Sequence, residues 1–266
     1  MHIVVCLKAI PDPEAPATAL RIDSAARRAT AGSYVISPFD ENALELALKL
    51  REAAGTGRIT ALSAGGAETD DRLRKALAVG ADAAVRVDAP AEPDPYAVAT
   101  VLAGGVRRWA DVQVVLAGRQ AGDWDHGQAG GLLAELLGWP HVPFVFAVSP
   151  DPERPDHLRL KRETAQGHAL VRAPLPLVIT ATNDAGNVLR LPRTRDVLQA
   201  RRASITEWSA AELPSGAPRT SVRALGPAAE TGRRCELLPG DGPAAQAEAL
   251  AAWLRERGLA SGGAFQ

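Results

Sequence analysis

Cysteine is nearly absent from this sequence: Cys6 and Cys235 are the only two in 266 residues, and they lie far apart. A chain of this length can bury a core without covalent cross-links, so a disulfide-stapled secreted scaffold is disfavoured. The first residues, MHIVVCLKAIPDP, also lack the basic start, long apolar stretch and cleavage site of a signal peptide. Both absences predict a cytoplasmic protein with reduced thiols.

Long apolar runs and an excess of charge are also missing. No stretch of about 18 apolar residues occurs, so we expect no transmembrane helix and no membrane insertion. The formal net charge of −1 provides no basic field, which argues against a nucleic-acid partner. With 46% hydrophobic and 23% charged residues, the composition is typical of a globular protein.

The common signatures of phosphate binding and catalysis are absent as well. The sequence contains no GxxxxGKS/T or GxGxxG phosphate-binding motif and no GxSxG nucleophile elbow. Cys6, at the end of an apolar run, is better interpreted as a small buried hydrophobic residue than as a nucleophile. The residues by themselves therefore indicate no evident catalytic machinery.

Over the first two thirds of the chain, short apolar runs alternate with longer helical patterns. The apolar runs lie at 2–8, 58–66, 81–88, 111–118 and 142–148, and the helical patterns at 37–55, 67–80, 94–110 and 127–138. This alternation predicts an α/β fold, a Rossmann-like parallel sheet with helices on both faces. Ser37 is expected to cap the first of these helices and Gly55 to end it.

The last third has a different pattern. Turn signals between strand-type runs over 151–182 predict two or three antiparallel strands. Residues 209–242 are rich in Pro, Gly, Ala and Ser, which predicts an extended arm, and 243–258 have the pattern of an amphipathic helix. We therefore expect an α/β domain over 1–208, with the antiparallel strands included, and a C-terminal arm over 209–266 that packs on another subunit.

The candidate site lies in VLAGRQAGDWDHGQAGGLLAELLGWP, residues 115–140. Ligands of parallel sheets bind outside the carboxyl ends of the strands, where this loop is expected to lie. Its glycines permit close backbone approach, and a helix starting near Gly127 favours a phosphate. Asp123, Asp125 and His126 could instead hold a metal ion, and the loop could be a structural turn, so a nucleotide is favoured without excluding either.

Six segments, taken in order, resemble the beta subunits of the electron transfer flavoprotein family, including its nitrogen-fixation-type members. They are VCLKAIPDP, SPFDENALELALKLRE, LRKALAVGADAAVRV, AGRQAGDWDHGQAGGLLAELLGWP, RE followed by LPLVIT, and DVLQARRASI. Any one of these segments is a weak signal. All six at family-like spacing across residues 1–208 are specific.

The resemblance implies an adenine-nucleotide alpha-hydrolase-like fold that pairs with a homologous alpha subunit. The alpha subunit would hold most of the FAD, and this chain would bind AMP in its own cleft. Electrons would pass from flavin dehydrogenases, such as those of fatty acid oxidation, through the FAD to a quinone-linked oxidoreductase. The protein would then be an electron carrier and not an enzyme that converts a metabolite, with its arm packed on the alpha subunit.

The resemblance also implies a set of cofactor-binding positions. They are Cys6, Ser37, Pro38, Phe39, Asp40, Ala64, Gly118, Arg119, Gln120, Asp123, Asp125, His126, Gly127, Gln128 and Ala129. Within this set, Gln128 and the N–H of Ala129 would lie near the AMP phosphate, and Phe39 would approach the flavin ring. RETAQG stands where the family has roughly RExDGG.

The partner-recognition loop departs from the family pattern. Its positions here are Arg190, Pro192, Thr194 and Arg195, and the family's anchoring leucine aligns with Thr194. Loss of an apolar anchor from an interface typically costs about 2 kcal/mol or more. The usual docking contact with dehydrogenases of the acyl-CoA type is therefore not expected in this chain.

Two alternatives accompany this interpretation. In electron-bifurcating relatives a second FAD takes the place of AMP, but bulky Trp124 and His126 would crowd a larger ligand, so AMP is favoured. A stand-alone adenine-nucleotide sensor with the same fold would need no alpha subunit. The long arm argues against that second alternative.

Overall fold

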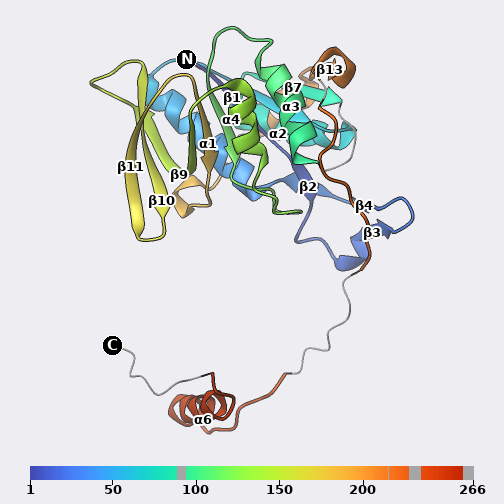
Figure 1. The fold of residues 1–266 in the computed structure, drawn as a ribbon, viewed down its shortest axis with the longest axis vertical. Coiled ribbons are helices and arrows are strands. Elements are labelled where there is room, and N and C mark those ends of the chain that lie inside the picture. Colours follow the sequence, from blue (N-terminus) through green and yellow to red (C-terminus); the bar gives the residue numbers. More distant parts are fainter. Residues whose placement is uncertain (89–93, 215, 228–234, 260–266) are drawn as a thin grey trace. The chain divides into compact units, whose positions relative to one another are not determined.

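A nine-stranded sheet forms the centre of the computed structural model, which describes residues 1–88, 94–214, 216–227 and 235–259 (Figure 1). In order across the sheet, the strands are β11 (Gly167–Pro174), β10 (His157–Thr164), β9 (His141–Pro150), β12 (Leu177–Ala181), β8 (Val112–Gly118), β1 (His2–Cys6), β6 (Arg58–Ala64), β7 (Ala83–Asp88) and β13 (Thr206–Ser209). Every neighbouring pair from β9 to β13 is parallel, whereas β10 is antiparallel to both β9 and β11. The predicted α/β class is confirmed.

The strand β12 corrects one detail of the prediction. Its sequence, LVITA, lies within the stretch that predicted two or three antiparallel strands, yet it pairs in parallel with β8 and β9. The hairpin of β10 and β11 at the sheet edge returns the chain so that β12 can enter between β9 and β8. All five β12 residues are buried, which is typical of an internal parallel strand and not of a surface hairpin.

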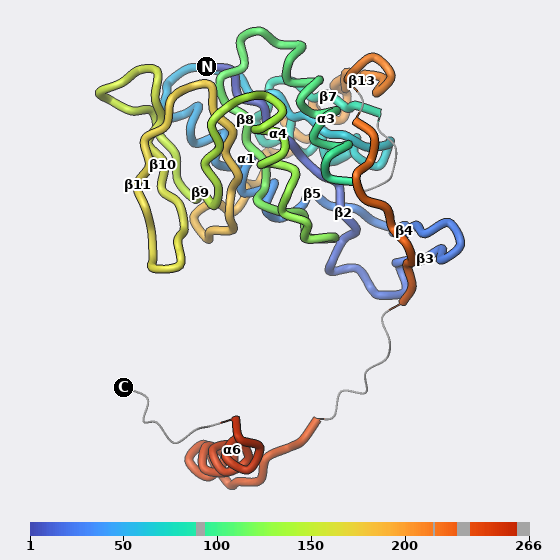
Figure 2. Tube along the Cα trace, in the orientation of Figure 1, coloured from blue at the N-terminus to red at the C-terminus, as the bar shows by residue number. Residues whose placement is uncertain are grey.

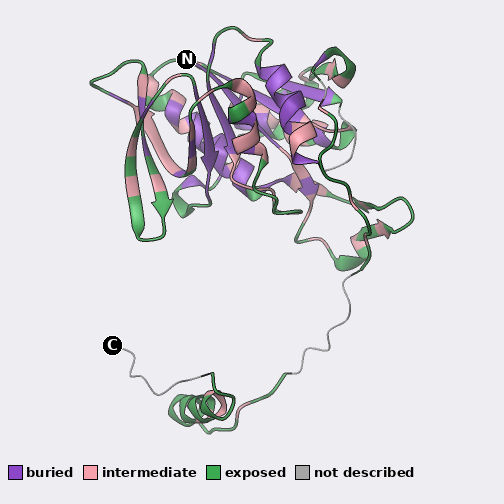
Figure 3. Ribbon diagram, viewed as in Figure 1, coloured by how far each residue is buried: buried purple, intermediate pink, exposed green. Residues whose placement is uncertain are grey.

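Helices cover both faces of the sheet. The helices α1 (Pro38–Ala54) and α2 (Asp70–Val79) contribute to the core on one face, and α3 (Pro95–Val106) and α4 (Ala129–Leu137) to the core on the other. The chain also forms α5 (Thr194–Arg202), which contacts α2, and α6 (Pro243–Glu256), which belongs to a separate unit described below. Side chains of β1 alternate between two cores: Ile3 and Val5 pack with α1 and α2, and Val4 and Cys6 pack with α3 and α4. Buried residues accordingly concentrate in the central strands and in the helices against them (Figure 3).

The ends of α1 follow the sequence prediction only in part. Gly55 ends the helix with a left-handed φ of 69°, as expected. Ser37 is the N-cap residue, but its side chain makes no capping hydrogen bond, and its buried Oγ has no partner among the described residues. Instead the Ser37 carbonyl accepts hydrogen bonds from the N–H groups of Asp40 and Glu41. The predicted side-chain cap is therefore wrong, because Pro38 and the backbone turn already form the helix start.

Smaller elements connect the main ones. They are β2 (Ala9–Pro11) paired with β5 (Tyr34–Ile36), β3 (Leu20–Asp23) paired with β4 (Arg28–Ala31), and the 3₁₀ turns η1 (Ala17–Ala19), η2 (Ala67–Thr69), η3 (Ala185–Asn187) and η4 (Ala210–Glu212). The two small sheets are antiparallel. Their strands are only three or four residues long, too short for sequence periodicity to predict them.

The chain divides into two compact units, 1–226 and 227–266. The first unit includes β13 and the following segment, in which Leu213 is buried. Within the second unit, Nε1 of Trp253 on α6 donates a hydrogen bond to Glu236 (2.6 Å), and the Arg257 guanidinium lies 4.0 Å from the Trp253 ring centroid. Among the described residues, no helix is both long and apolar enough to cross a bilayer.

Candidate functional site

The winding of the sheet reverses between β1 and β8. From β1 the chain adds β6 and then β7 on one side, and it crosses back to place β8 on the other. Ligands of such sheets bind in the crevice outside the strand ends at this switch point. A cleft lies there, lined by Cys6, Leu7, Lys8, Asp40, Ala64, Pro95, Val98, Leu102, Ala117, Gly118, Arg119, Gln120, Ala121, Trp124, His126, Gly127, Gln128, Ala129, Gly130 and Leu133.

Most of the residues chosen from the sequence come together in this cleft. Those that line it are Cys6, Asp40, Ala64, Gly118, Arg119, Gln120, His126, Gly127, Gln128 and Ala129. Those that do not are Ser37, Pro38, Phe39, Asp123 and Asp125. The apolar wall on α3 (Pro95, Val98 and Leu102) was not anticipated, because α3 is apolar nearly all round and its sequence does not mark one face.

Asp40, in the first turn of α1, joins the ends of β1 and β8. Its Oδ2 accepts a hydrogen bond from the Lys8 N–H and its Oδ1 accepts one from the Gly118 N–H, both at 2.8 Å. The carboxyl is 6% exposed, and burial raises its pKa to about 7 although both N–H bonds act in the opposite direction. Asp40 therefore holds the two sides of the switch point together.

The loop after β8 uses its carboxylates to hold its own shape. Lys8 Nζ donates to both carboxylate oxygens of Asp123 at 2.7 Å, and Gln120 Nε2 donates to Asp125 at 2.7 Å. Asp125 and Gly127 adopt left-handed φ values of 52° and 63°. Within the ranges that the structure describes, no group of three or more His, Cys, Asp or Glu side chains is placed to hold a metal ion.

The start of α4 faces the apolar wall across the cleft. Gln128 is the N-cap residue and its side chain makes no capping hydrogen bond. The first N–H groups of the helix have no intrahelical acceptor, and among the described residues no capping side chain takes its place. A Cβ on Gly130 would lie 2.2 Å from Cγ2 of Thr180, so only glycine lets α4 sit this close to β12. An apolar wall opposite a helix start fits a nucleotide, with its base on the wall and its phosphate at the N–H groups.

Trp124 and His126 stand together at the cleft. Their ring centroids are 5.9 Å apart with planes tilted by 33°, and Trp124 remains 37% exposed. Both side chains line the cleft although neither is needed to close the hydrophobic core.

Arg119, which also lines the cleft, contacts two aromatic rings near the start of α1. Its Cζ lies 4.9 Å from the Phe39 centroid and 5.8 Å from that of Phe144, a residue with a φ of 60° that is 40% exposed. Its Nη1 donates to Thr182 at 3.3 Å and lies 3.9 Å from the Glu163 carboxylate. The adjacent residues Phe39 and Asp40 of α1 thus have different contacts: Phe39 meets Arg119, and Asp40 binds the N–H groups of Lys8 and Gly118.

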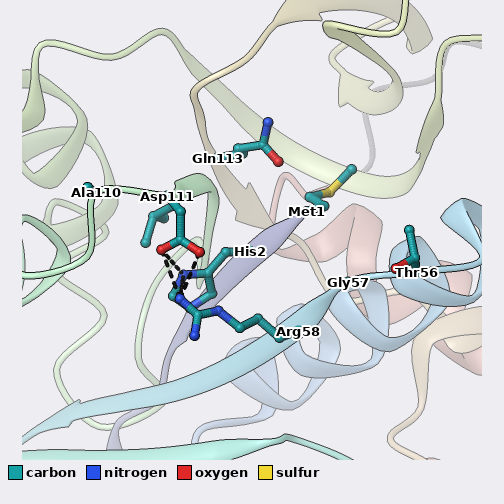
Figure 4. Close-up of a pocket in the computed structure, with 9 residues that line it drawn as sticks. Met1, His2, Thr56, Gly57, Arg58, Ala110, Asp111 and Gln113 are labelled. Carbon is teal, nitrogen blue, oxygen red and sulfur yellow. Dashed lines mark hydrogen bonds and ion pairs between the residues drawn. The ribbon is translucent and has the colours of Figure 1, made fainter.

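A second hollow lies at the opposite, amino edge of the sheet, where β1, β6 and β8 begin (Figure 4). His2 Nδ1 is 3.1 Å from Asp111 and its Nε2 is 2.9 Å from the hydroxyl of Thr60, while Arg58 Nη2 donates to both Asp111 oxygens at 2.8 Å. His2 and Thr60 are 2% and 4% exposed, whereas the Asp111 side chain is 60% exposed. This Asp–His–Thr row ties three strand starts together and is a structural cluster.

This cluster leads to a pH-dependent prediction. Burial, with a smaller contribution from Arg58, lowers the pKa of His2 below 6.5, although Asp111 acts in the opposite direction. Because the folded state disfavours the proton, the stability contributed by neutral His2 is present above about pH 6.5 and is lost as the pH falls further. The free energy of unfolding, measured in urea between pH 8 and pH 5, should fall more steeply for the wild type than for His2→Gln. Parallel curves for the two proteins would contradict the assignment.

Comparison with known proteins shows the family to which this chain belongs. A sequence profile described as "Electron transfer flavoprotein domain" matches residues 28–213. The electron transfer flavoprotein subunit beta of Megasphaera elsdenii is 31% identical over 243 residues, which cover 85% of this chain and 87% of that protein. The chain belongs to the electron transfer flavoprotein family. Protein FixA of Bradyrhizobium diazoefficiens is 30% identical over 259 residues, covering 92% of this chain and 88% of FixA, and the Bacillus subtilis subunit beta is 32% identical over 231 residues.

Three apolar side chains are exposed in the segment 188–202 of this chain: Val188, Leu191 and Leu198. Arg190 is held by Glu45 (2.8 Å) and Glu52, so its guanidinium serves the fold. Thr194, the position aligned with the family's leucine, begins α5 and is exposed. Three residues earlier, Leu191 is 93% exposed. Leu191 is the most exposed apolar side chain of this segment.

Proposed function

We propose that this electron transfer flavoprotein chain is the beta subunit of a heterodimer, in which it binds AMP and completes the FAD site of an alpha subunit. Relatives named as beta subunits, which match most of this chain, support the role as a beta subunit, and the switch-point cleft supports the binding of a nucleotide. The complex would take electrons from flavin dehydrogenases and pass them to a quinone-linked oxidoreductase. The chain itself would convert no metabolite.

The single observation that carries the AMP proposal is the cleft with two unlike sides. Pro95, Val98 and Leu102 offer a surface for a purine ring, and the uncapped start of α4 offers N–H groups for one phosphate. Trp124 and His126 line the cleft, and we expect their bulk to crowd a dinucleotide. These features favour a mononucleotide over a second FAD.

The FAD of the alpha subunit would lie against the Phe39 side of the α1 start. Phe39 and Phe144 provide ring surface there, and Arg119, which lies over both rings, provides positive charge near the flavin. An arginine beside a flavin stabilises negative charge that develops on the reduced ring. The left-handed φ of Phe144 is consistent with a position selected for function, since bulky residues rarely adopt it.

Co-expression with the alpha subunit tests the proposal. We expect a yellow heterodimer that releases one AMP and one FAD on denaturation, measured by mass spectrometry against protein concentration. Two FAD and no AMP would establish the bifurcating type instead. A chain that binds adenine nucleotide but never associates with the alpha subunit would instead be a nucleotide sensor. If the two chains do not associate and no flavin is retained, the proposed role as a beta subunit is refuted.

We also propose that Leu191 replaces the missing leucine as the anchor for dehydrogenases. Leu191→Ala should weaken binding of the dehydrogenase about 30-fold, because truncating an apolar interface anchor costs about 2 kcal/mol. Thr194→Ala should change binding less than threefold. The apparent KM for the heterodimer in a dehydrogenase assay measures both. A larger effect at Thr194 than at Leu191 would show that the anchor has not moved.

A further inference from the structure

The helix α3 lies between the nucleotide cleft and a later segment of the chain. Pro95, Val98 and Leu102, at helical spacings of three and four, line the cleft. Tyr96, Thr100 and Gly104 follow one another at spacings of four on the opposite side of the helix. Gly105 faces the sheet, where an added Cβ would lie 3.4 Å from both Leu62 and Trp208.

The side opposite the cleft is covered by the chain after η4, here called the strap (213–214 and 216–222). A Cβ on Gly104 would lie 2.6 Å from Cδ of Pro214, and one on Gly216 would lie 2.7 Å from Oγ1 of Thr100. At these two points the strap packs directly on the helix. Farther along, the Val222 carbonyl accepts a hydrogen bond from Arg27 at the β3–β4 hairpin, and the strap can be followed past α3 to that hairpin in Figure 2.

Asp94, the N-cap residue of α3, fastens the strap. One carboxylate oxygen, Oδ1, accepts the Ala97 N–H at 2.7 Å and caps the helix. The other, Oδ2, accepts three hydrogen bonds from the strap: from the N–H groups of Arg219 (3.0 Å) and Thr220 (2.8 Å) and from the Thr220 hydroxyl (2.7 Å). The Arg219 guanidinium also lies 4.5 Å from the Tyr96 ring centroid.

The charge state of Asp94 suits this role. The carboxyl is only 4% exposed, and burial opposes its ionisation. The hydrogen bonds from Thr220, Ala97 and Arg219 nevertheless hold its pKa below the ordinary value. An ionised carboxylate that accepts four hydrogen bonds is a strong attachment, because charge-assisted hydrogen bonds are stronger than neutral ones.

We propose that the strap and the nucleotide cleft are coupled through α3, with Asp94 as the positioning residue. Released from Asp94, the strap would uncover the Thr100–Gly104 side and loosen the first turn of α3, which carries Pro95 and Val98 of the cleft wall. Nucleotide binding would in turn hold α3 in the position that the strap fits, because coupling between two sites is reciprocal. The inference rests on the proposed nucleotide function, and it makes the root of the C-terminal arm a sensor of cleft occupancy.

Asp94→Asn separates the two duties of this residue. Asparagine caps helices as well as aspartate does, so Oδ1 can keep the Ala97 N–H. Its amide group would replace the oxygen that faces three donors, so the strap contact is lost. Thr220→Val removes one of the three bonds from the strap side and leaves α3 unaltered. Asp184→Asn, at the N-cap of η3, is the matched control because Asp184 caps Gly186 and makes no contact with the strap.

The experiment uses the full chain, with AMP as the ligand, and measures amide hydrogen exchange over 216–222 and the Kd for AMP by calorimetry. We expect AMP to slow exchange of the strap in the wild type. Asp94→Asn should speed that exchange and raise the Kd about fivefold or more, Thr220→Val should do the same to a smaller extent, and Asp184→Asn should do neither. If Asp94→Asn fails to fold, Thr220→Val provides the same two measurements.

Two results would overturn the coupling. One is a strap that exchanges faster in Asp94→Asn while the Kd for AMP stays within twofold of wild type. The other is an unchanged exchange of the wild-type strap at saturating AMP. Both leave the nucleotide function intact, whereas a wild-type chain that binds no adenine nucleotide refutes that function and the coupling together.

Discussion

Gly118→Ala is expected to lower the free energy of unfolding by about 1–3 kcal/mol, the usual cost of overpacking a close contact. An added Cβ would lie 2.6 Å from Oδ1 of Asp40 and 2.7 Å from Cβ of Phe39, and 2.9 Å from the Phe39 backbone carbon. The backbone of the first turn of α1 cannot move aside as a flexible side chain could. Either β8 or α1 must shift, and the hydrogen bond from the Gly118 N–H to Asp40 is lost with that shift.

The same substitution should weaken AMP binding at least tenfold, or about 1.4 kcal/mol, because the loop that lines the cleft starts at Gly118. Gly131→Ala is the matched control, since a Cβ there meets only His141 at 3.8 Å. Within α4, alanine in place of glycine should stabilise by up to about 1 kcal/mol. Urea unfolding and calorimetric titration measure both variants. Equal stability and equal AMP affinity of the two variants would show that neither stability nor binding depends on the close approach of β8 and α1.

Asp40→Asn should remove a pH dependence that the wild type shows around neutrality. Burial raises the pKa of Asp40 from 3.8 to about 7, so the folded state keeps a proton that the unfolded chain releases. The stability from this proton is complete below pH 3.8 and is lost as the pH rises through about 7. At 1.36 kcal/mol per pKa unit, the loss amounts to about 4 kcal/mol at most.

Asparagine at position 40 does not titrate, but it places an amide group against one of the two N–H donors, Lys8 or Gly118. That mismatch costs about 1–3 kcal/mol at every pH. The wild type should therefore exceed Asp40→Asn in stability most clearly at pH 5.5, and the difference should narrow by pH 8.5. Asp71→Asn, at a side chain that is 75% exposed, should leave the wild-type profile unchanged. A constant difference between wild type and Asp40→Asn across this range would contradict the assignment.

The elements that periodicity predicts were found close to their expected positions. The helix predicted over 37–55 spans Pro38–Ala54, and the run 111–118 became β8 at Val112–Gly118. Apolar spacing and terminal residues act within one or two turns of chain, so the local sequence suffices for them. The strand β12 escaped this reasoning, because the turn signals before it indicated a series of hairpins, and only the packing of whole elements decides which strands become its neighbours.

The candidate site divides in the same way. The sequence by itself determined that a glycine-rich, acidic loop follows an apolar strand and precedes a helix, which is sufficient to predict a ligand at a sheet edge. The tertiary structure decided what each residue does: Asp123 meets Lys8 from 115 positions away, and Asp40 meets Gly118 from 78. It also brought Asp94 to Thr220, 126 positions along the chain. Contacts between residues so far apart follow from how whole elements pack, and a buried carboxylate acquires its partners and its pKa only when that packing removes it from water.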